Sequence, residues 1–160
     1  MGQQSEPSDA SLEWWVDTWG DRLVRYAYVM TRDHHLAQDV VQETFIKLMV
    51  FQRRYPERVV VPGWLFTTAR RVALTLLRRR PEVAADVVES SGSDAHIWIP
   101  PAFRELVDTL PLLERECVWL FYYADWPTEQ IARHLGCKPG AVRGRLFSAR
   151  QHLRQLWEDE

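Results

Sequence analysis

The sequence predicts an all-α fold. Apolar residues recur at three- and four-residue steps in several segments, with charged residues between them, which is the spacing of helices that bury one face. Short polar breaks, prolines and glycines separate these segments. One run with strand-like composition, Val59–Val61, has no obvious second run to pair with, so we interpret it as an extended loop.

Two amphipathic helices are predicted first. Ser11 is a suitable N-cap for the first helix, and the polar break at 31–33 separates it from the second. The apolar stripe of the first comprises Leu12, Trp15, Val16, Trp19, Leu23, Tyr26, Ala27 and Met30. The stripe of the second comprises Ala37, Val40, Val41, Thr44, Phe45, Leu48 and Met49. Its other face carries Asp39, Gln42, Glu43, Ile46 and Lys47.

A third helix is predicted to begin at Pro62. Pro56 cannot continue the second helix, because proline lacks a backbone donor and restricts the residue before it. Pro62, in contrast, suits a first helical position. The buried stripe would be Leu65, Ala69, Val72, Ala73, Leu76 and Leu77. The exposed face would carry Thr67, Arg70 and Arg71.

The second half of the chain begins without periodicity. Residues 82 to about 100 contain the run Ser90–Ser91–Gly92–Ser93 and several acidic residues and are interpreted as a solvated linker. A length of 160 residues allows one average domain or two small ones. Residues 110–123 are apolar and predicted to be helical.

A helix-turn-helix follows. Ala132 allows two helices to cross closely, and Gly136 can take the left-handed conformation that ends the first. Pro139 can open the second, which Val142 and Leu146 would pack against its partner. The outer face of the second helix carries Lys138, Arg143, Arg145, Arg150 and Arg154, as a helix in a DNA major groove requires.

Positive charge is concentrated in two segments of an acidic chain. Residues 51–82 contain eight Arg against two Glu, and residues 138–157 contain five cations and no acid, although the whole chain has a net charge of −2. Such localised charge indicates a protein that contacts a polyanion at two defined places. Tyr55 and Arg58, in the loop before the third helix, are suited to hold unstacked bases.

Several classes of function are disfavoured. No run of about 18 apolar residues exists, so no membrane span is expected, and we expect a soluble, cytoplasmic protein. Cys117 and Cys137 lack a metal-binding or redox spacing and are interpreted as packing thiols. The histidines show no catalytic or metal-binding spacing and are interpreted as solvated or capping residues. We therefore expect no enzyme activity, metal or cofactor.

Several motifs, in order and spacing, resemble the extracytoplasmic-function (ECF) sigma factors of bacterial RNA polymerase. The matching segments are Asp39–Phe45, Gly63–Arg70, Leu110–Pro111 with Glu114–Glu116, Ile131–Gly136 and Gly140–Leu146. The resemblance implies an N-terminal domain at residues 10–81, an acidic linker at 82–103 and a C-terminal domain at 104–160. It also implies core RNA polymerase and promoter DNA as partners, with no catalytic residues in the chain, and an anti-sigma factor as a regulator.

The resemblance assigns roles to individual residues. Contact with the coiled coil of the largest polymerase subunit falls to Asp39, Gln42, Glu43 and Ile46. Capture of the −10 element falls to Tyr55, Arg58, Val59, Val60, Val61, Thr67, Arg70 and Arg71. Reading of the −35 element falls to Lys138, Ala141, Arg143, Arg145 and Arg150, in a domain that would also bind the flap of the second-largest subunit.

The chain departs from the family pattern at five positions: Thr67, Arg71, Thr75, Lys138 and Gly144. The first three predict an altered −10 preference. Lys138 lacks a capping side chain and Gly144 lies within a helix, so both lower the expected stability of the second helix-turn-helix helix. The alternative function is a conventional helix-turn-helix repressor or activator, although no spare apolar helix is seen for the dimer that such proteins usually form.

Overall fold

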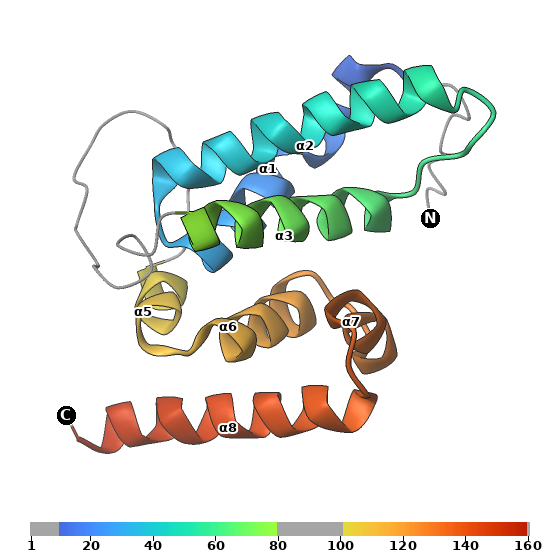
Figure 1. Cartoon of the computed structure of the whole chain (residues 1–160). Coiled ribbons are helices and arrows are strands. Elements are labelled where there is room, and N and C mark those ends of the chain that lie inside the picture. Colours follow the sequence, from blue (N-terminus) through green and yellow to red (C-terminus); the bar gives the residue numbers. More distant parts are fainter. Residues whose placement is uncertain (1–9, 80–100, 160) are drawn as a thin grey trace.

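The computed structural model describes residues 10–79 and 101–159, which are helical and contain no strand (Figure 1). The elements are α1 (Leu12–Thr31), α2 (His34–Arg54), α3 (Pro62–Arg79), α5 (Pro101–Thr109), α6 (Leu112–Val118), the π-helix η1 (Trp119–Tyr123), α7 (Thr128–Leu135) and α8 (Pro139–Glu158). The predicted all-α fold is confirmed. Helices α1–α3 pack together as the N-terminal unit, residues 10–79, and α6–α8 pack together within the C-terminal unit, residues 101–159.

The first helices begin and end at the predicted polar residues. The Ser11 hydroxyl accepts a hydrogen bond from the Trp14 amide at 3.3 Å, so the predicted cap of α1 is confirmed. Arg32 has a left-handed φ of 56° and ends that helix. The Asp33 carboxylate then accepts from the Leu36 amide at 2.9 Å and caps α2. Two consecutive polar residues, Arg32 and Asp33, therefore separate two long helices.

The valine run is a loop, as predicted. Helix α2 stops before Pro56, and residues 55–61 are irregular up to the start of α3 at Pro62. Val60 is buried, whereas Val59 and Val61 are 66% and 51% exposed. The loop is therefore anchored to the N-terminal unit by one side chain and presents the other two to solvent.

The helix-turn-helix is confirmed in its predicted positions. Gly136 has a φ of 68°, and the Cys137 amide donates to the Ala132 carbonyl at 3.0 Å, which ends α7. Pro139 occupies the first turn of α8, and Val142 and Leu146 are buried between the two helices. Glycine suits position 136 because it adopts this conformation without the steric cost that a side chain adds.

Lys138→Ser is expected to stabilise the C-terminal unit. Lys138 is the N-cap of α8 with extended dihedral angles, and its side chain makes no capping hydrogen bond. A serine there can accept from an amide of the first turn, which stabilises a helix by about 1 kcal/mol. Urea unfolding should show this gain, and Lys138→Ala, which removes the charge without adding a cap, should not.

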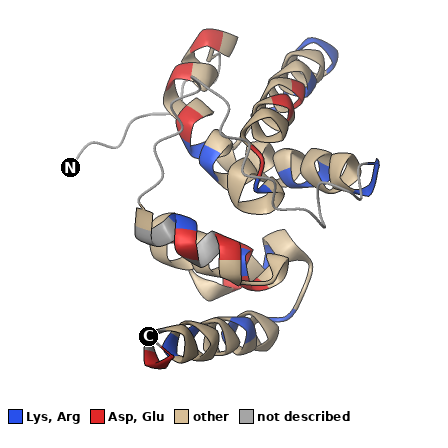
Figure 2. Ribbon diagram, turned by 90° about the vertical axis from the view of Figure 1, so that its left-hand side faces the viewer, with Lys and Arg blue, Asp and Glu red and all other residues tan. Residues whose placement is uncertain are grey.

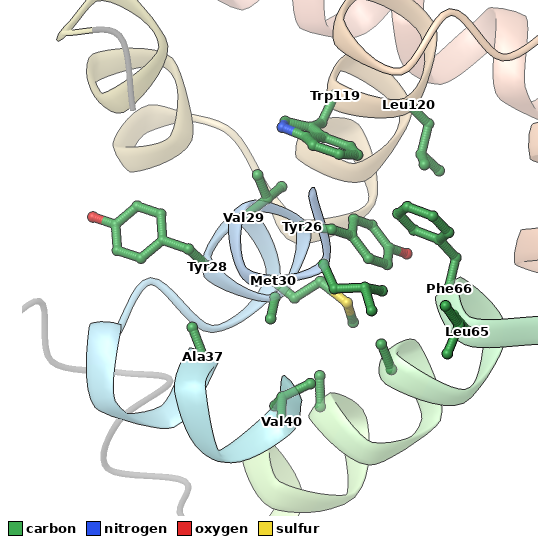
Figure 3. Packing of buried hydrophobic residues seen from close by; sticks show 14 of the residues in the cluster. Tyr26, Tyr28, Val29, Met30, Ala37, Val40, Leu65, Phe66, Trp119 and Leu120 are labelled. Atoms are coloured by element: carbon green, nitrogen blue, oxygen red, sulfur yellow. The ribbon is translucent and has the colours of Figure 1, made fainter. Parts of the chain in front are cut away.

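The two units share one continuous hydrophobic core. Trp119 and Leu120 from the C-terminal unit lie close to Tyr26 and Phe66 from the N-terminal unit (Figure 3). The ring centroids of Tyr26 and Trp119 are 5.5 Å apart, and those of Phe66 and Trp126 are 5.4 Å apart. In this conformation the C-terminal unit packs directly on α1 and α3.

Most of the predicted linker, residues 82–100, lies outside the described residues. Helix α5 begins at Pro101, inside the range 82–103 predicted for the linker. Within residues 10–79 and 101–159, every helix is too short or too polar to cross a lipid bilayer.

Candidate nucleic-acid interface

The four residues predicted to contact polymerase share one exposed face of α2, and all four line a groove of about 700 Å³ between α2 and α3. The groove is bordered by Asp39, Gln42, Glu43, Ile46 and Lys47 from α2 and by Trp64, Thr68, Arg71, Thr75 and Arg79 from α3. Ile46, which is 45% exposed, gives this face an apolar centre. Carboxylates therefore border one side of the groove and guanidinium groups the other.

Tyr55 lies in a cluster of rings and cations at the start of the valine loop. The guanidinium carbons of Arg58 and Arg54 are 4.8 Å and 5.6 Å from its ring centroid, and Phe51 packs at 5.2 Å. The two arginine distances are within the range of a cation–π interaction. The structure thus brings Tyr55 and Arg58 together, next in the chain to the exposed Val59 and Val61.

The remaining residues predicted for the −10 element are divided between two other places. Arg71 is exposed and lines the groove between α2 and α3. Thr67 and Arg70, which the helical pattern placed on an exposed face, are instead partly buried against the C-terminal unit. That expectation of exposure is wrong because the pattern of a single helix does not reveal a second domain packed on its polar side.

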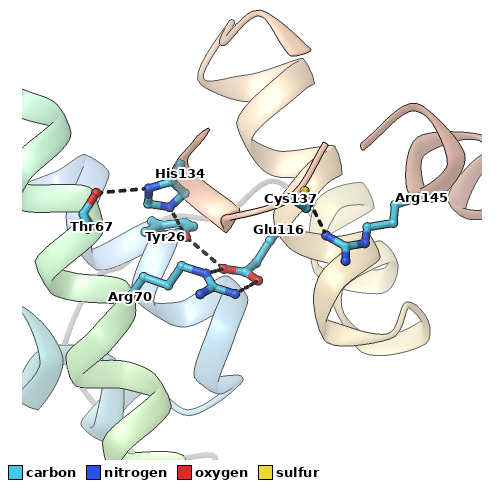
Figure 4. Close-up of polar contacts among 7 residues, drawn as sticks. All are labelled: Tyr26, Thr67, Arg70, Glu116, His134, Cys137 and Arg145. Carbon is cyan, nitrogen blue, oxygen red and sulfur yellow. Dashed lines mark hydrogen bonds and ion pairs between the residues drawn. The ribbon is translucent and has the colours of Figure 1, made fainter. Parts of the chain in front are cut away.

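Thr67 and Arg70 belong to a chain of hydrogen bonds between the two units (Figure 4). Arg70 donates from Nε to Glu116 Oε1 at 2.9 Å and from Nη2 to Oε2 at 3.3 Å. The Tyr26 hydroxyl donates to the same Oε1 at 2.9 Å. Glu116 is fully buried, so its charge depends on these donors.

His134 completes the chain of hydrogen bonds. Its Nε2 lies 2.8 Å from the Tyr26 hydroxyl, and its Nδ1 lies 3.4 Å from the Thr67 hydroxyl. Because the Tyr26 proton is donated to Glu116, the tyrosine oxygen accepts from Nε2–H, and Nδ1 accepts from Thr67. These five residues, Tyr26, Thr67, Arg70, Glu116 and His134, are called the interdomain network below.

Burial shifts the pKa of several of these groups. Burial and the Glu116 carboxylate raise the pKa of Tyr26 well above its usual value, so its hydroxyl remains a donor. Burial alone would lower the pKa of Arg70, but the hydrogen bond and charge of Glu116 outweigh it and raise that pKa. Burial, and then the Arg70 charge, lower the pKa of His134 to about 4. The network therefore contains a neutral histidine at neutral pH.

Acidification is expected to destabilise the protein through His134. Its pKa is about 4 in the folded state and about 6.5 when unfolded, so the unfolded state gains the proton first as the pH falls. The contribution of neutral His134 to the free energy of unfolding is present above about pH 6.5 and is lost as the pH falls towards about 4. Between about pH 7 and about pH 5 this loss amounts to about 2 kcal/mol. Tyr26 and Arg70 are the titratable groups facing the ring.

The measurement is urea unfolding of the wild type and of His134→Gln at both pH values. Glutamine cannot gain a proton in this range, so the difference between the two proteins isolates the histidine from carboxylates that also titrate. An equal pH dependence in both proteins would contradict the assignment.

The residues predicted to read the −35 element lie at the start of α8 and along it. Lys138, Ala141, Arg143 and Arg150 are exposed, and Figure 2 shows Lys and Arg along this helix with acidic residues at its C-terminal end. Arg145 is partly buried, and its Nη1 donates to Cys137 Sγ at 3.7 Å. Arg150 donates to the Tyr122 hydroxyl at 3.1 Å. Arg143 is thus the arginine near the start of α8 that faces solvent.

Sequence reasoning missed two members of the interdomain network. His134 is not a solvated histidine, as the sequence suggested, because it lies between the two units. Glu116 belongs to the motif Glu114–Glu116 and occupies the same helical stripe as Leu112 and Leu120. A charge on an otherwise apolar stripe is a signal of a buried ion pair, and it was available in the sequence.

The cysteines and acidic residues do not form a metal site in the described part of the chain. There, no group of three or more His, Cys, Asp or Glu side chains is placed to bind a metal ion. Cys117 and Cys137 are both free thiols. Burial raises the pKa of Cys117 to about 11, so this thiol stays protonated at neutral pH.

Two family models match the two units. Residues 15–82 match sigma-70 region 2, and residues 102–153 match sigma-70 region 4. Among solved structures, the fold is similar to the sigma factor RpoE of Bartonella quintana in complex with the anti-sigma factor NepR, with a TM-score of 0.72 over 91% of this chain and 96% of that one, at 23% identity. It is also similar to CnrH in complex with the cytosolic domain of CnrY, with a TM-score of 0.65 over 93% and 88% of the chains, at 23% identity.

Sequence relatives span most of the chain. The ECF RNA polymerase sigma factor SigL of Mycobacterium tuberculosis is 32% identical over 148 residues, which cover 82% of this chain and 80% of the relative. CarQ of Myxococcus xanthus, an RNA polymerase sigma factor, is 31% identical and covers 79% and 78%. SigM of Bacillus subtilis is 28% identical and covers 84% and 88%. With the two region matches in the expected order, these relatives establish that the chain belongs to the ECF family of RNA polymerase sigma factors.

Proposed function

We propose that α2 binds core RNA polymerase through Asp39, Gln42, Glu43 and Ile46, against the coiled coil of the largest subunit. The support is the exposure of all four side chains on one face beside a groove. Acidic groups around an apolar centre suit a partner helix that is basic and amphipathic. The α2 side of the groove is thus the docking site for polymerase in this proposal.

The valine loop and α3 capture the −10 element in the same proposal. Tyr55 offers a ring for an unstacked base, and Arg54 and Arg58 beside it offer two cations for phosphates. Val59 and Val61 offer exposed apolar surface, while Val60 anchors the loop. The exposed Arg71 of α3 extends this surface, and Thr67 and Arg70 join it once the C-terminal unit has moved away.

Helix α8 reads the −35 element as duplex DNA. Lys138, Ala141 and Arg143 lie in its first turns, where a recognition helix contacts base edges. Arg145 and Arg150 join them, with phosphate contacts that position the helix. The C-terminal unit also contacts the flap of the second-largest polymerase subunit.

Further parts of the proposal concern regulation and location. The two similar solved structures are sigma factors in complexes with an anti-sigma factor and with the cytosolic domain of CnrY. We extend this to the present chain and infer an anti-sigma partner. The protein acts in the cytoplasm, where polymerase is found, and contributes no catalytic residue or cofactor of its own.

The observation that carries the proposal is the separation of an acidic, apolar-centred face on α2 from an arginine-bearing recognition helix, α8, in one chain. The test is run-off transcription from a library of randomised promoters, with purified core polymerase with and without this protein. Protein-dependent starts that share two separated elements are expected. Specific duplex binding by the free protein without any starts would instead indicate a conventional helix-turn-helix regulator.

A further inference from the structure

The interdomain network occupies two residues that the proposed function assigns to promoter DNA. Arg70 gives two donors to Glu116, and Thr67 is hydrogen-bonded to His134. The side chain of Arg70 is only 18% exposed, and that of Glu116 is fully buried. A DNA strand cannot reach Arg70 or Thr67 while the C-terminal unit is packed against α1 and α3.

The partner of Arg70 has the chemistry of a phosphate. A guanidinium group binds carboxylate and phosphate oxygens through the same planar pair of N–H donors. Glu116 receives such a pair, from Nε at 2.9 Å and from Nη2 at 3.3 Å. Because one guanidinium edge cannot bind both anions, Glu116 and a DNA phosphate exclude each other at this position.

We propose that the interdomain network is an autoinhibitory latch in which Glu116 takes the place of a −10 strand phosphate on Arg70 and keeps the free protein closed. This inference rests on the proposed −10 roles of Thr67 and Arg70. The latch opens when polymerase and promoter DNA together bind the separated units. In that state Arg70 and Thr67 are free to contact DNA.

The latch is accompanied by other contacts between the units. They include the ring pairs Tyr26–Trp119 and Phe66–Trp126 and an exposed ion pair in which Arg32 Nη2 lies 3.4 Å from Asp108 Oδ1. An exposed ion pair adds little. The polar groups of the latch regain water on opening, so only a part of each hydrogen bond is lost. A ligand that binds only the open state can therefore shift the equilibrium by its differential affinity.

A quantitative consequence follows for the free protein. When the binding-competent state is a minor fraction of the protein, the apparent dissociation constant equals the intrinsic constant divided by that fraction, so binding is weaker. Weakening the latch should therefore tighten DNA binding without adding any contact to DNA. Glu116→Gln keeps the shape of the side chain but removes the charge that pairs with Arg70.

The experiment uses the full chain with two separate readouts. Small-angle scattering measures the radius of gyration, and fluorescence anisotropy measures binding of a single-stranded −10 oligonucleotide taken from a promoter recovered in the transcription library. For Glu116→Gln we expect a larger radius of gyration and about tenfold tighter oligonucleotide binding.

The matched control is Glu114→Gln, which removes a carboxylate that pairs with His152 inside the C-terminal unit at 2.8 Å. The control should match the wild type in both readouts.

The outcomes separate the latch from the proposed function. An unchanged radius of gyration in Glu116→Gln would overturn the latch, while promoter-dependent transcription by the wild type would leave the sigma-factor roles intact. Opening without tighter oligonucleotide binding would overturn the competition for Arg70 and also count against its −10 role.

If circular dichroism shows that Glu116→Gln has lost helix, Tyr26→Phe replaces it as the test variant. This variant keeps the buried ring, removes the hydroxyl that joins Glu116 to His134, and should open the protein by a smaller amount; no opening would again overturn the latch.

Discussion

Ile46→Glu is expected to weaken association with core RNA polymerase by about two orders of magnitude. Ile46 is 45% exposed in the free protein and lies among carboxylates at the groove that α2 and α3 form. A glutamate there would place a further negative charge at the apolar centre of the proposed interface, and a substitution at such a centre costs about 2 to 4 kcal/mol. Co-purification and a binding titration with core polymerase measure the effect.

The matched control for this prediction is Val50→Glu. Val50 lies one turn further along α2, is 55% exposed and does not line the groove. Val50→Glu introduces the same charge on the same helix but outside the groove, so it should leave polymerase binding nearly unchanged. Charge reversal by Glu43→Lys should weaken binding in the same direction as Ile46→Glu. If Ile46→Glu and Glu43→Lys both bind polymerase as tightly as the wild type, the polymerase interface is elsewhere.

Arg143→Ala is expected to reduce promoter-directed transcription by about ten- to a hundredfold while polymerase binding stays intact. Arg143 is exposed in the first turns of α8, and loss of one arginine contact to a base edge costs about 1 to 3 kcal/mol. Run-off transcription from a defined promoter measures the loss, and substitutions in the −35 element should have little further effect on the variant.

The control for Arg143 is Arg154→Ala. Arg154 is also an exposed arginine of α8, but it lies three turns closer to the C-terminus. It should lower transcription only slightly, because a distant phosphate contact adds affinity without sequence choice. Loss of polymerase association in Arg143→Ala, or an equal loss of transcription in both variants, would contradict the role of Arg143.

The fold was predictable because its signals are local. Ser11 caps α1, Gly136 ends α7 in the left-handed conformation, and Pro62 and Pro139 open α3 and α8. Each of these effects depends on the dihedral preferences or hydrogen-bonding groups of one residue and its near neighbours. The apolar stripes similarly report which face of each helix is buried.

The candidate site was predictable only where it lies on one element. Asp39, Glu43 and Ile46 share a helix face, so their spacing alone places them together. The eight residues assigned to the −10 element do not share a face. The structure places Tyr55 in a ring cluster, Arg71 in the groove with the polymerase residues, and Arg70 against Glu116.

Local patterns were sufficient to predict helices α1, α2, α3, α7 and α8, the helix ends at Ser11 and Gly136, the helix-turn-helix and the family, because periodicity, capping and motif order are properties of neighbouring residues. Helix α5, which begins inside the predicted linker, was not predicted. The pairing of Arg70 with Glu116 and the position of a neutral His134 between the units became apparent only from the packing of the helices. These contacts join residues 46 and 108 positions apart in the chain, Arg70 with Glu116 and Tyr26 with His134. No local pattern encodes which polar side chain will meet which across this interface, since that depends on how helices far apart in the chain pack against one another.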